Sequence, residues 1–516
     1  MIYLSFPLTF ALISTLVVHR QGLSIWWDYY NYEYSGGFIF RQGLRSAFAL
    51  PGQYQTYITP HLNWIYYFLE NSLGSRKQEV LIAVLESLTL TFVSWTTFAI
   101  CQIQKLSKAH SMIIAYFSGF LVLLNPLFRT ELGATMSDTV VAGVLILGCA
   151  LFARAFLLDS SEVHGPSIIA GGILLGLSTD LKLTSGFYVL SALLALACAL
   201  LCRVKDIGIY KTAKKWALAV STTLAAFTIA YSMQAFQLWE KYRNPLFPYF
   251  NGIFRSPYQL TTNLSDQRFT VHDLSHYARN IAGLVTGTTN IQDGGILIRY
   301  PSVVVATVIA IALVIENFTR RRDGFLMFIE LMGVTSFFVW TRELVLLRYG
   351  APLILGISLI WITSSVYRFG SKGGKLVASL CILALLSLFN CGGAAVIHDK
   401  SLVAHFSVDD QKLQQSRHNI VLVGGGALGF IYPYLPRNSE VVRIGGNLQV
   451  TMSQLYWERV RTFVLSRRGG WTAFLEASDH DLSIQDFFPG RVLTSCVVAA
   501  SWRHHEVMKC NISEDE

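Results

Sequence analysis

Residues 184–202 read TSGFYVLSALLALACALLC, a run of nineteen residues without a charged side chain. An α-helix rises about 1.5 Å per residue, so a run of about this length can cross the roughly 30 Å hydrocarbon core of a bilayer. The run is continuous, whereas a membrane β-strand would alternate polar and apolar residues over about ten positions. This segment therefore predicts a membrane-spanning helix.

The rest of the chain has the same character. Of its 516 residues, 53% are hydrophobic and only 14% are charged, and the mean hydropathy is +0.44. Soluble domains carry about 25% charged residues, so a single water-soluble globule is excluded. We predict an all-α polytopic membrane protein with about eleven spans in residues 1–394. The predicted spans are 1–19, 79–101, 110–128, 139–158, 167–180, 184–202, 216–238, 299–317, 324–341, 346–366 and 376–394. The fifth of these spans is short and contains three glycines, so it could be part of a broken helix.

Basic residues are distributed unevenly over the short loops between the spans. Alternate loops hold fourteen Lys and Arg residues, whereas the short loops on the opposite side hold four. Because cytoplasmic loops are rich in Lys and Arg, the N-terminus is predicted to be cytoplasmic. The first span lacks a small-x-small cleavage site and is expected to be retained. With an odd number of spans, the long segments 20–78, 239–298 and 395–516 all lie on the outer side.

The outer segment 395–516 is predicted to form a small α/β domain, with a helix at 457–465 and a strand at 492–500. It contains a G-x-G-x-x-G match after an apolar run, but no βαβ unit with a later acidic residue is evident, so a dinucleotide site is discarded. Its two cysteines, Cys496 and Cys510, are compatible with a disulfide, which the spacing does not establish. The net charge of +9 is explained by the cytoplasmic loops, and no nucleic-acid partner is expected.

The first outer loop begins IWWDYYNYEYSGGF at residues 25–38 and places Asp28 and Glu33 among Trp and Tyr residues. A carboxylate partly screened from water by aromatic rings can have a raised pKa and act as a general base. Aromatic faces beside acids also suit sugar rings, so Trp27, Tyr30 and Asn31 are candidate substrate contacts. An interfacial aromatic belt is the alternative, but it accounts for the rings and leaves the acids unexplained.

Two further outer stretches supply weaker candidates. His61 lies in QYQTYITPHLNWIYYFLE, residues 53–70, which is typical of an amphipathic helix in the membrane interface, and it could contact a phosphate or a sugar. Glu131 and Asp138 lie in RTELGATMSD, residues 129–138, on the same side as Asp28. Asp138 can equally serve as an N-cap for the next helix.

Lys182 and Arg348 are two of the few basic residues on the outer side. A cation at this depth is costly unless it is paired or faces a polar cavity. Either side chain could bind a lipid-linked phosphate, Arg through a bidentate fork and Lys as a point charge. Snorkelling to the lipid headgroups is the alternative for both. The proline-rich stretch 242–258 excludes a regular helix and predicts a rigid cover over the membrane surface.

Together these segments resemble a group of bacterial polytopic membrane proteins that share the fold of the GT-C glycosyltransferase superfamily. The resemblance runs in order through most of the chain. It is carried by WDYYNYEY (27–34), QTYITPHLN (55–63), ELGATMSD (131–138), LKLTSG (181–186), NPLFPYFNGIFRSPY (244–258), RYGAPL (348–353) and VLVGGGALGFIYPYLP (421–436).

The resemblance implies an inverting transferase that takes a hexose or pentose from a polyprenyl-phosphate donor on the outer face of the bacterial inner membrane. The acid of the first outer loop then maps to Asp28, with Glu33 as a possible partner, although group members often carry His where this chain has Glu33. A second acid would be Asp138 or Glu131. The cation that binds the donor phosphate would be Arg348 or Lys182. The acceptor would be a cell-envelope glycan or lipid. The resemblance implies no particular cofactor and leaves a divalent cation open.

Two other functions are alternatives to a transferase: a transporter or flippase for a lipid-linked substrate, and a non-catalytic partner of a polysaccharide assembly system. Transporters usually contain repeated halves and place polar residues at the bilayer midplane. Here the acids gather at one interface and no repeat is visible, which favours the transferase. The sequence does not identify the sugar or the acceptor.

Overall fold

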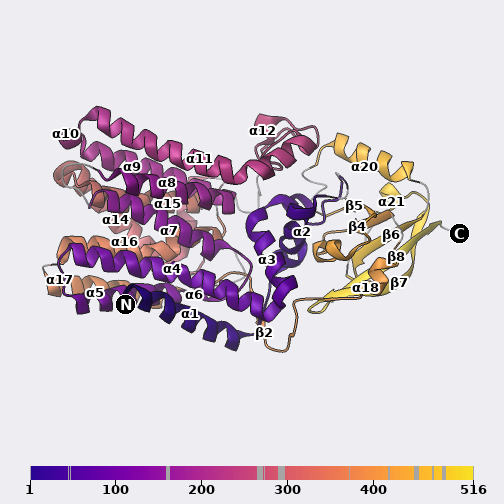
Figure 1. Cartoon of the computed structure of the whole chain (residues 1–516), viewed down its shortest axis with the longest axis horizontal. Helices are drawn as coiled ribbons and strands as arrows, with labels where there is room; N and C mark the ends of the chain where they lie inside the picture. The colour runs from indigo at the N-terminus through magenta and orange to yellow at the C-terminus, as the bar shows by residue number, and fades with distance from the viewer. Residues whose placement is uncertain are drawn as a thin grey trace. The chain divides into compact units, whose positions relative to one another are not determined.

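The structure is a computed structural model, and it contains two compact units (Figure 1). The membrane unit is Met1–Arg20, Val80–Ala230 and Asp266–Ile397, and the outer unit is Gln21–Glu79, Tyr231–Ser265 and His398–Glu516. The first outer loop thus belongs to the same unit as the C-terminal segment. The structure describes residues 2–44, 46, 48–157, 163–263, 271, 273–288, 297–343, 345–370, 372–416, 419–446, 452–467, 470–478 and 484–514.

Each of the eleven predicted spans contains a helix. Within the described residues, eight helices are long and apolar enough to cross a membrane, and three apolar helices are shorter. The eight are α1 (Ile2–Gln21), α4 (Ser75–Ile103), α7 (Asp138–Ala155), α9 (Gly186–Cys202), α11 (Ile209–Tyr242), α14 (Pro301–Glu316), α15 (Gly324–Glu343) and α16 (Ala351–Phe369). The shorter three are α5 (Lys108–Leu123), α8 (Gly165–Leu181) and α17 (Gly373–Leu388). The predicted all-α membrane fold is confirmed.

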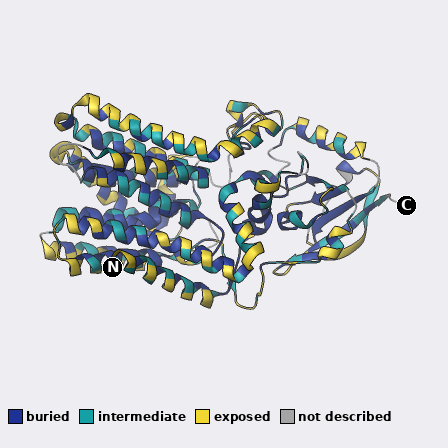
Figure 2. Ribbon diagram, in the orientation of Figure 1, coloured by how far each residue is buried: buried dark blue, intermediate teal, exposed yellow. Residues whose placement is uncertain are grey.

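Helices α15 and α16 form the centre of the membrane unit, and α1 and α11 lie at its periphery. Over an apolar stretch of 18 residues in each helix, 72% of the residues of α15 and 83% of those of α16 are buried. The corresponding shares are 22% for α1 and 17% for α11, and Figure 2 shows how burial varies over the helices. Exposed leucines recur every four residues along α1, from Leu4 to Leu16. Such an apolar stripe on the outside of the unit is suited to contact with lipid tails.

Helix α8, which corresponds to the short fifth span, is continuous, and its glycines allow close packing. A Cβ at Gly171 would lie 2.9 Å from the carbonyl oxygen of Gly148 in α7. A Cβ at Gly176 would lie 2.3 Å from the carbonyl oxygen of Thr223 in α11. Small residues at helix interfaces let backbones approach closely in membranes. The glycines therefore place α8 against both neighbours, and the helix is not broken.

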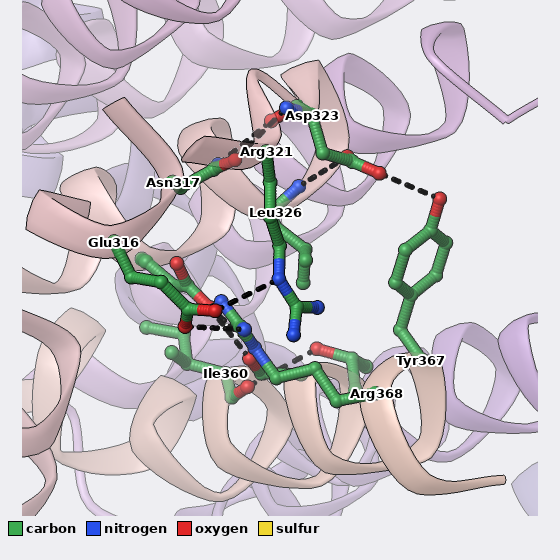
Figure 3. Close-up of polar contacts among 11 residues, drawn as sticks. Glu316, Asn317, Arg321, Asp323, Leu326, Ile360, Tyr367 and Arg368 are labelled. Carbon is green, nitrogen blue, oxygen red and sulfur yellow. Dashed lines mark hydrogen bonds and ion pairs between the residues drawn. The ribbon is translucent and has the colours of Figure 1, made fainter. Parts of the chain in front are cut away.

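A buried charge network connects α14, α15 and α16 on the side predicted to be cytoplasmic. Arg368 lies next to Glu316 and donates to its Oε2 from Nη1 at 3.1 Å (Figure 3). Its Nη2 donates to Glu330 Oε1 at 2.7 Å, and the side chains of Arg368 and Glu330 are 5% and 1% exposed. Tyr367 points toward Asp323 and donates to its Oδ2 at 2.9 Å (Figure 3). Three helices of the membrane unit are thus joined by ionic side chains.

The C-terminal part of the outer unit is built on a six-stranded sheet with the order β3-β7-β8-β6-β4-β5. Strands β4, β5 and β6 are parallel, and β3, β7 and β8 pair antiparallel to their neighbours. The strands are β3 (Ser407–Val408), β4 (Asn419–Val423), β5 (Glu440–Ile444), β6 (Trp471–Glu476), β7 (Arg491–Trp502) and β8 (His505–Glu514). Helix α20 (Gln454–Ser466) and β7 confirm the predicted helix and strand, and a disulfide joins Cys496 to Cys510.

The first outer loop is largely helical. Its elements are β1 (Leu23–Ile25), the π-helix η1 (Tyr29–Glu33), α2 (Tyr34–Gln42), the 3₁₀ helix η2 (Gln53–Tyr57) and α3 (Pro60–Leu73). The shorter elements of the C-terminal part are β2 (Ile397–Asp399), α18 (Asp410–Gln414), the 3₁₀ helix η7 (Gly429–Tyr434) and α21 (Ile484–Phe487).

The proline-rich stretch of the second long outer loop forms turns around the short helix α12 (Asn251–Phe254), and its role as a cover over the membrane surface stays a prediction. The side chain of Asn251 donates to the backbone carbonyls of Ser256, Gln259 and Leu260, which fixes the turn. Helix α13 (Leu274–Thr286), later in the same loop, was not predicted. Residues 264–270, 272 and 289–296 of this loop lie outside the described residues.

His405 ties the C-terminal segment to the first outer loop within the outer unit. Its Nδ1 lies 3.1 Å from Glu70 Oε2, and its Nε2 lies 3.1 Å from Glu79 Oε1. Burial lowers the pKa of His405, but the hydrogen bonds to Glu70 and Glu79 outweigh it and raise the pKa to about 9. Burial likewise opposes ionisation of Glu70, yet the hydrogen bond from His405 lowers its pKa. The imidazolium is therefore the folded-state form at neutral pH.

This histidine predicts a pH-dependent stability. Because its folded pKa lies above the usual value near 6.5, its stabilisation of about 3 kcal/mol is complete below pH 6.5 and is lost as the pH rises through about 9. We expect the melting temperature of the full-length protein in nanodiscs to fall between pH 7 and pH 9.5, and that of His405→Gln to fall much less. If the melting temperatures of the two proteins fall equally over this pH range, His405 is not the group responsible.

Candidate active site

Asp28 directly precedes η1 and is buried, with 5% of its surface exposed. Its Oδ2 accepts a hydrogen bond from the hydroxyl of Tyr32 at 2.9 Å, one helical turn later. Single π-turns are uncommon and occur often at functional sites. The side chain predicted as the general base is thus held in place and is not turned into bulk solvent.

Glu33 ends the same π-helix and is 3% exposed. Its Oε1 accepts a hydrogen bond from Trp26 Nε1 at 3.3 Å. Asp28 and Glu33 thus receive hydrogen bonds from different aromatic residues. Trp27 lies between the buried residues Trp26 and Asp28 in the sequence, and it is 37% exposed.

The remaining candidates of the first outer loop are engaged inside the outer unit. Tyr30 is fully buried and stacks on Trp502, with ring centroids 4.5 Å apart. Asn31 donates from Nδ2 to Gln55 Oε1 at 3.0 Å. The ring of His61 packs against a phenylalanine of α2 at 4.8 Å. These contacts shape the loop, and a sugar contact for the three residues stays a prediction.

In the membrane unit, Asp138 and Lys182 form an ion pair. Lys182 Nζ lies 2.6 Å from Asp138 Oδ1 and donates to the carbonyl of Met136 at 3.4 Å. The two residues are 5% and 9% exposed. Asp138 is the first residue of α7 and Ser137 is the N-cap residue, so the carboxylate of Asp138 serves an ion pair. The structure brings together an acid and a cation that are 44 positions apart in the sequence.

Tyr349 lies close to both predicted cations. Lys182 Nζ is 5.2 Å from the centroid of its ring, and the guanidinium carbon of Arg348 is also 5.2 Å away. The hydroxyl of Tyr188 donates to the carbonyl of Tyr349 at 2.6 Å, which fixes this stretch. Cations within about 6 Å of an aromatic face are attracted by the ring. Arg348 and Lys182, the partner of Asp138, therefore lie beside one tyrosine that the sequence did not single out.

Glu131 is fully buried at the end of α6 (Pro126–Glu131), and the loop that follows is held by a second acid. This acid, Glu86 of α4, accepts hydrogen bonds from Gly133 N at 2.6 Å and from Thr139 Oγ1 at 2.5 Å. Sequence reasoning missed Glu86. The signal was present, because an acid within the apolar run 81–92 is expensive in a membrane unless it has a role.

The membrane unit also contains an apolar cavity between α4, α7, α15 and α16, lined by residues that include Ile146, Cys149, Phe328 and Met332. None of the predicted site residues lines it, so it is separate from the candidate polar site. Among the residues that the structure describes, no group of three or more His, Cys, Asp and Glu side chains could hold a metal ion.

The comparisons with known proteins bear on the fold. No protein-family profile matches the sequence, and a search of curated proteins found no match. Among solved structures, the chain is similar to ArnT from Cupriavidus metallidurans, in a crystal structure with bound undecaprenyl phosphate and in one of the apo state. Both comparisons have a TM-score of 0.54 at 13% identity and cover 98% of this chain, with 98% and 97% of the ArnT chains covered.

At this identity the likeness shows the fold. The chain is a multi-pass membrane protein with a GT-C-like fold and a C-terminal domain that contains a β-sheet. The predicted resemblance is confirmed at this level.

Proposed function

We propose that the protein is an integral membrane glycosyltransferase that moves a sugar from a polyprenyl-phosphate donor to a glycan or lipid acceptor of the cell envelope. The observation that carries the proposal is the end-to-end likeness to ArnT in a structure with undecaprenyl phosphate. Polyprenyl phosphate is the product that remains when such a donor loses its sugar. The N-terminus is assigned to the cytoplasm and the outer unit to the outer face of the bacterial inner membrane.

In the proposed reaction Asp28 is the general base. Its carboxylate takes the proton of an acceptor hydroxyl while that oxygen forms a bond to the anomeric carbon. The bond between the anomeric carbon and the phosphate oxygen breaks, and both electrons leave with polyprenyl phosphate. In-line attack inverts the anomeric configuration. The buried position of Asp28 and the hydrogen bond from Tyr32 support this role, because a general base must be held in one geometry.

The leaving phosphate requires positive charge, and Arg348 is the better candidate of the two predicted cations. The charge of Lys182 is already balanced by Asp138 at 2.6 Å. Arg348 is only partly buried, and its planar guanidinium can bind two phosphate oxygens at once. We assign Lys182 and Asp138 to the wall of the phosphate site, next to Tyr349.

The test is donor consumption by the purified full-length protein in nanodiscs. Undecaprenyl-phosphate sugars, both hexosyl and pentosyl, are supplied with a cell-envelope lipid extract as acceptor, and free undecaprenyl phosphate is measured. We expect one lipid-linked donor to be consumed, while the matching nucleotide sugar is left intact. If no donor is consumed but labelled lipid-linked sugar crosses the bilayer of proteoliposomes, the protein is a flippase and the proposal fails.

A further inference from the structure

The glycine-rich turn after β4 lies where three parallel strands end. β4 is flanked by β5 and β6, and the register aligns Val423 with Ile444 and Leu422 with Phe474. The chain passes from β4 to β5 on one side and then to β6 on the other. Such a topological switch point, at the carboxyl ends of the strands, is where open α/β sheets bind ligands.

The occupant of this switch point is the chain's own first outer loop. Arg443 is fully buried, and its guanidinium donates to the carbonyls of Pro51 at 3.1 Å and Gly424 at 2.6 Å. Gln53 Nε2 donates to the carbonyl of Gly425 at 3.3 Å. The carbonyl of Gly425 and Nη1 of Arg443, two polar groups at this switch point, are therefore already bonded to this loop.

Two glycines then connect the loop and the sheet to η1. A Cβ at Gly429 would lie 1.7 Å from the carbonyl oxygen of Asn31. A Cβ at Gly52 would lie 2.3 Å from Cβ of Tyr32. Real Cβ atoms do not approach so closely, so the backbone of η1 is in direct contact with the backbone at both glycines. Tyr32 in turn donates its hydroxyl to Asp28.

We propose that the C-terminal sheet positions Asp28: its switch point holds the first outer loop, and Gly429 and Arg443 are positioning residues that fix the π-helix on which Asp28 stands. The inference rests on the proposed function, since it gives the catalytic loop a support. It also gives the last glycine of the nucleotide-binding motif match a structural reason: Gly429 permits close approach of the η1 backbone.

The test compares two alanine substitutions in the same turn. In the full-length protein, Gly429→Ala inserts a methyl group against Asn31. Gly425→Ala is the control, since its Cβ would meet only Gly446 Cα, at 3.9 Å, and the carbonyl bound by Gln53 is kept. Amide hydrogen exchange of peptides covering residues 26–35 and 419–423 reports on the loop and the sheet, and donor consumption gives kcat and KM.

For Gly429→Ala we expect faster amide exchange in residues 26–35 and unchanged exchange in residues 419–423. We also expect kcat to fall by about 10- to 100-fold while the donor KM stays within twofold of wild type. Misplacing a reacting group by about 1 Å lowers the rate by about this factor. Gly425→Ala should behave as wild type. An unchanged kcat despite faster loop exchange would overturn the positioning role. Unchanged exchange would overturn the contact itself, and equal effects of both substitutions would also overturn the proposal.

A gentler variant covers the case in which Gly429→Ala does not fold. Phe430→Leu adds no atoms to the site and replaces with a smaller aliphatic side chain the ring that packs on Tyr30, with centroids 6.1 Å apart. A kcat loss of about 2- to 10-fold with unchanged KM supports the proposal, and unaltered kcat together with faster loop exchange refutes it. If the wild-type protein consumes no donor, the proposed function fails, and Gly429 and Arg443 then have no role in catalysis. The exchange experiment does not depend on activity and still decides whether the sheet holds the loop.

Discussion

Asp28→Asn is expected to lower kcat for sugar transfer by about 10²- to 10⁴-fold, the usual contribution of a general base. Asparagine has the same shape, and its Oδ1 can still accept the hydrogen bond that Tyr32 donates at 2.9 Å. The fold should therefore be kept while the proton acceptor is lost. The measurement is the initial rate of undecaprenyl phosphate release, at saturating donor, for variant and wild-type proteins with matched melting temperatures.

The matched control is Asp409→Asn, another aspartate of the outer unit. Asp409 is the N-cap of α18, its side chain is 41% exposed, and asparagine caps helices about as well as aspartate does. We expect a wild-type rate for this variant. An Asp28→Asn protein that keeps its activity would remove Asp28 from the mechanism, and an equally slow Asp409→Asn protein would show that the loss is not specific.

Arg368→Met should destabilise the membrane unit by about 3 to 5 kcal/mol, because it leaves Glu330 buried without its cation. Replacing both partners, in Arg368→Met with Glu330→Met, should recover most of this loss, since an apolar pair of similar volume needs no charge compensation. The measurement is the unfolding of the detergent-solubilised protein in increasing denaturant, followed by tryptophan fluorescence.

Arg321→Met is the comparison for this network. Arg321 also pairs with Glu316, at 2.9 Å, but its side chain is 48% exposed. Exposed pairs contribute about 0 to 1 kcal/mol, so this variant should be nearly as stable as wild type. A double variant as unstable as Arg368→Met alone would mean that Arg368 stabilises the helices through packing rather than through charge.

The spans could be predicted because crossing a bilayer imposes a length and an apolar character on each helix, and these are local properties. Helix α8 shows the limit of local reasoning. Its glycines could equally indicate a break or a close contact, and only the neighbours Gly148 and Thr223 decide for the contact. Helix α13 was missed because thirteen residues within a long polar loop give no such length signal.

In the candidate site, contacts within one segment could be predicted from the sequence, whereas contacts between segments could not. Asp28 and Tyr32 are four residues apart on one helical segment, so their contact follows from local geometry. The pairing of Asp138 with Lys182 joins the start of α7 to the end of α8, and the sequence around either residue does not indicate the other as its partner, 44 positions away. Glu86 was readable as an acid inside an apolar run, but its partners at Gly133 and Thr139 depend on how α4 and α7 pack.

The G-x-G-x-x-G match in the C-terminal segment is explained only in part by local sequence. A tight turn after a strand requires glycine, and Gly424 has a φ of +88°. What fills the space beside the turn is set by the tertiary structure, where Pro51 and Gln53 are bound.

The order of the strands in the outer unit has a consequence for biogenesis. The residues around Asp28 leave the ribosome well before β8, which lies inside the sheet between β7 and β6 and is made after the other five strands of that sheet. At about 5 to 20 residues per second, the two events are separated by tens of seconds. A chain that stops before β8 would reach the membrane with its helices in place but without the complete sheet, so we expect premature termination to yield inserted protein whose first outer loop lacks its support.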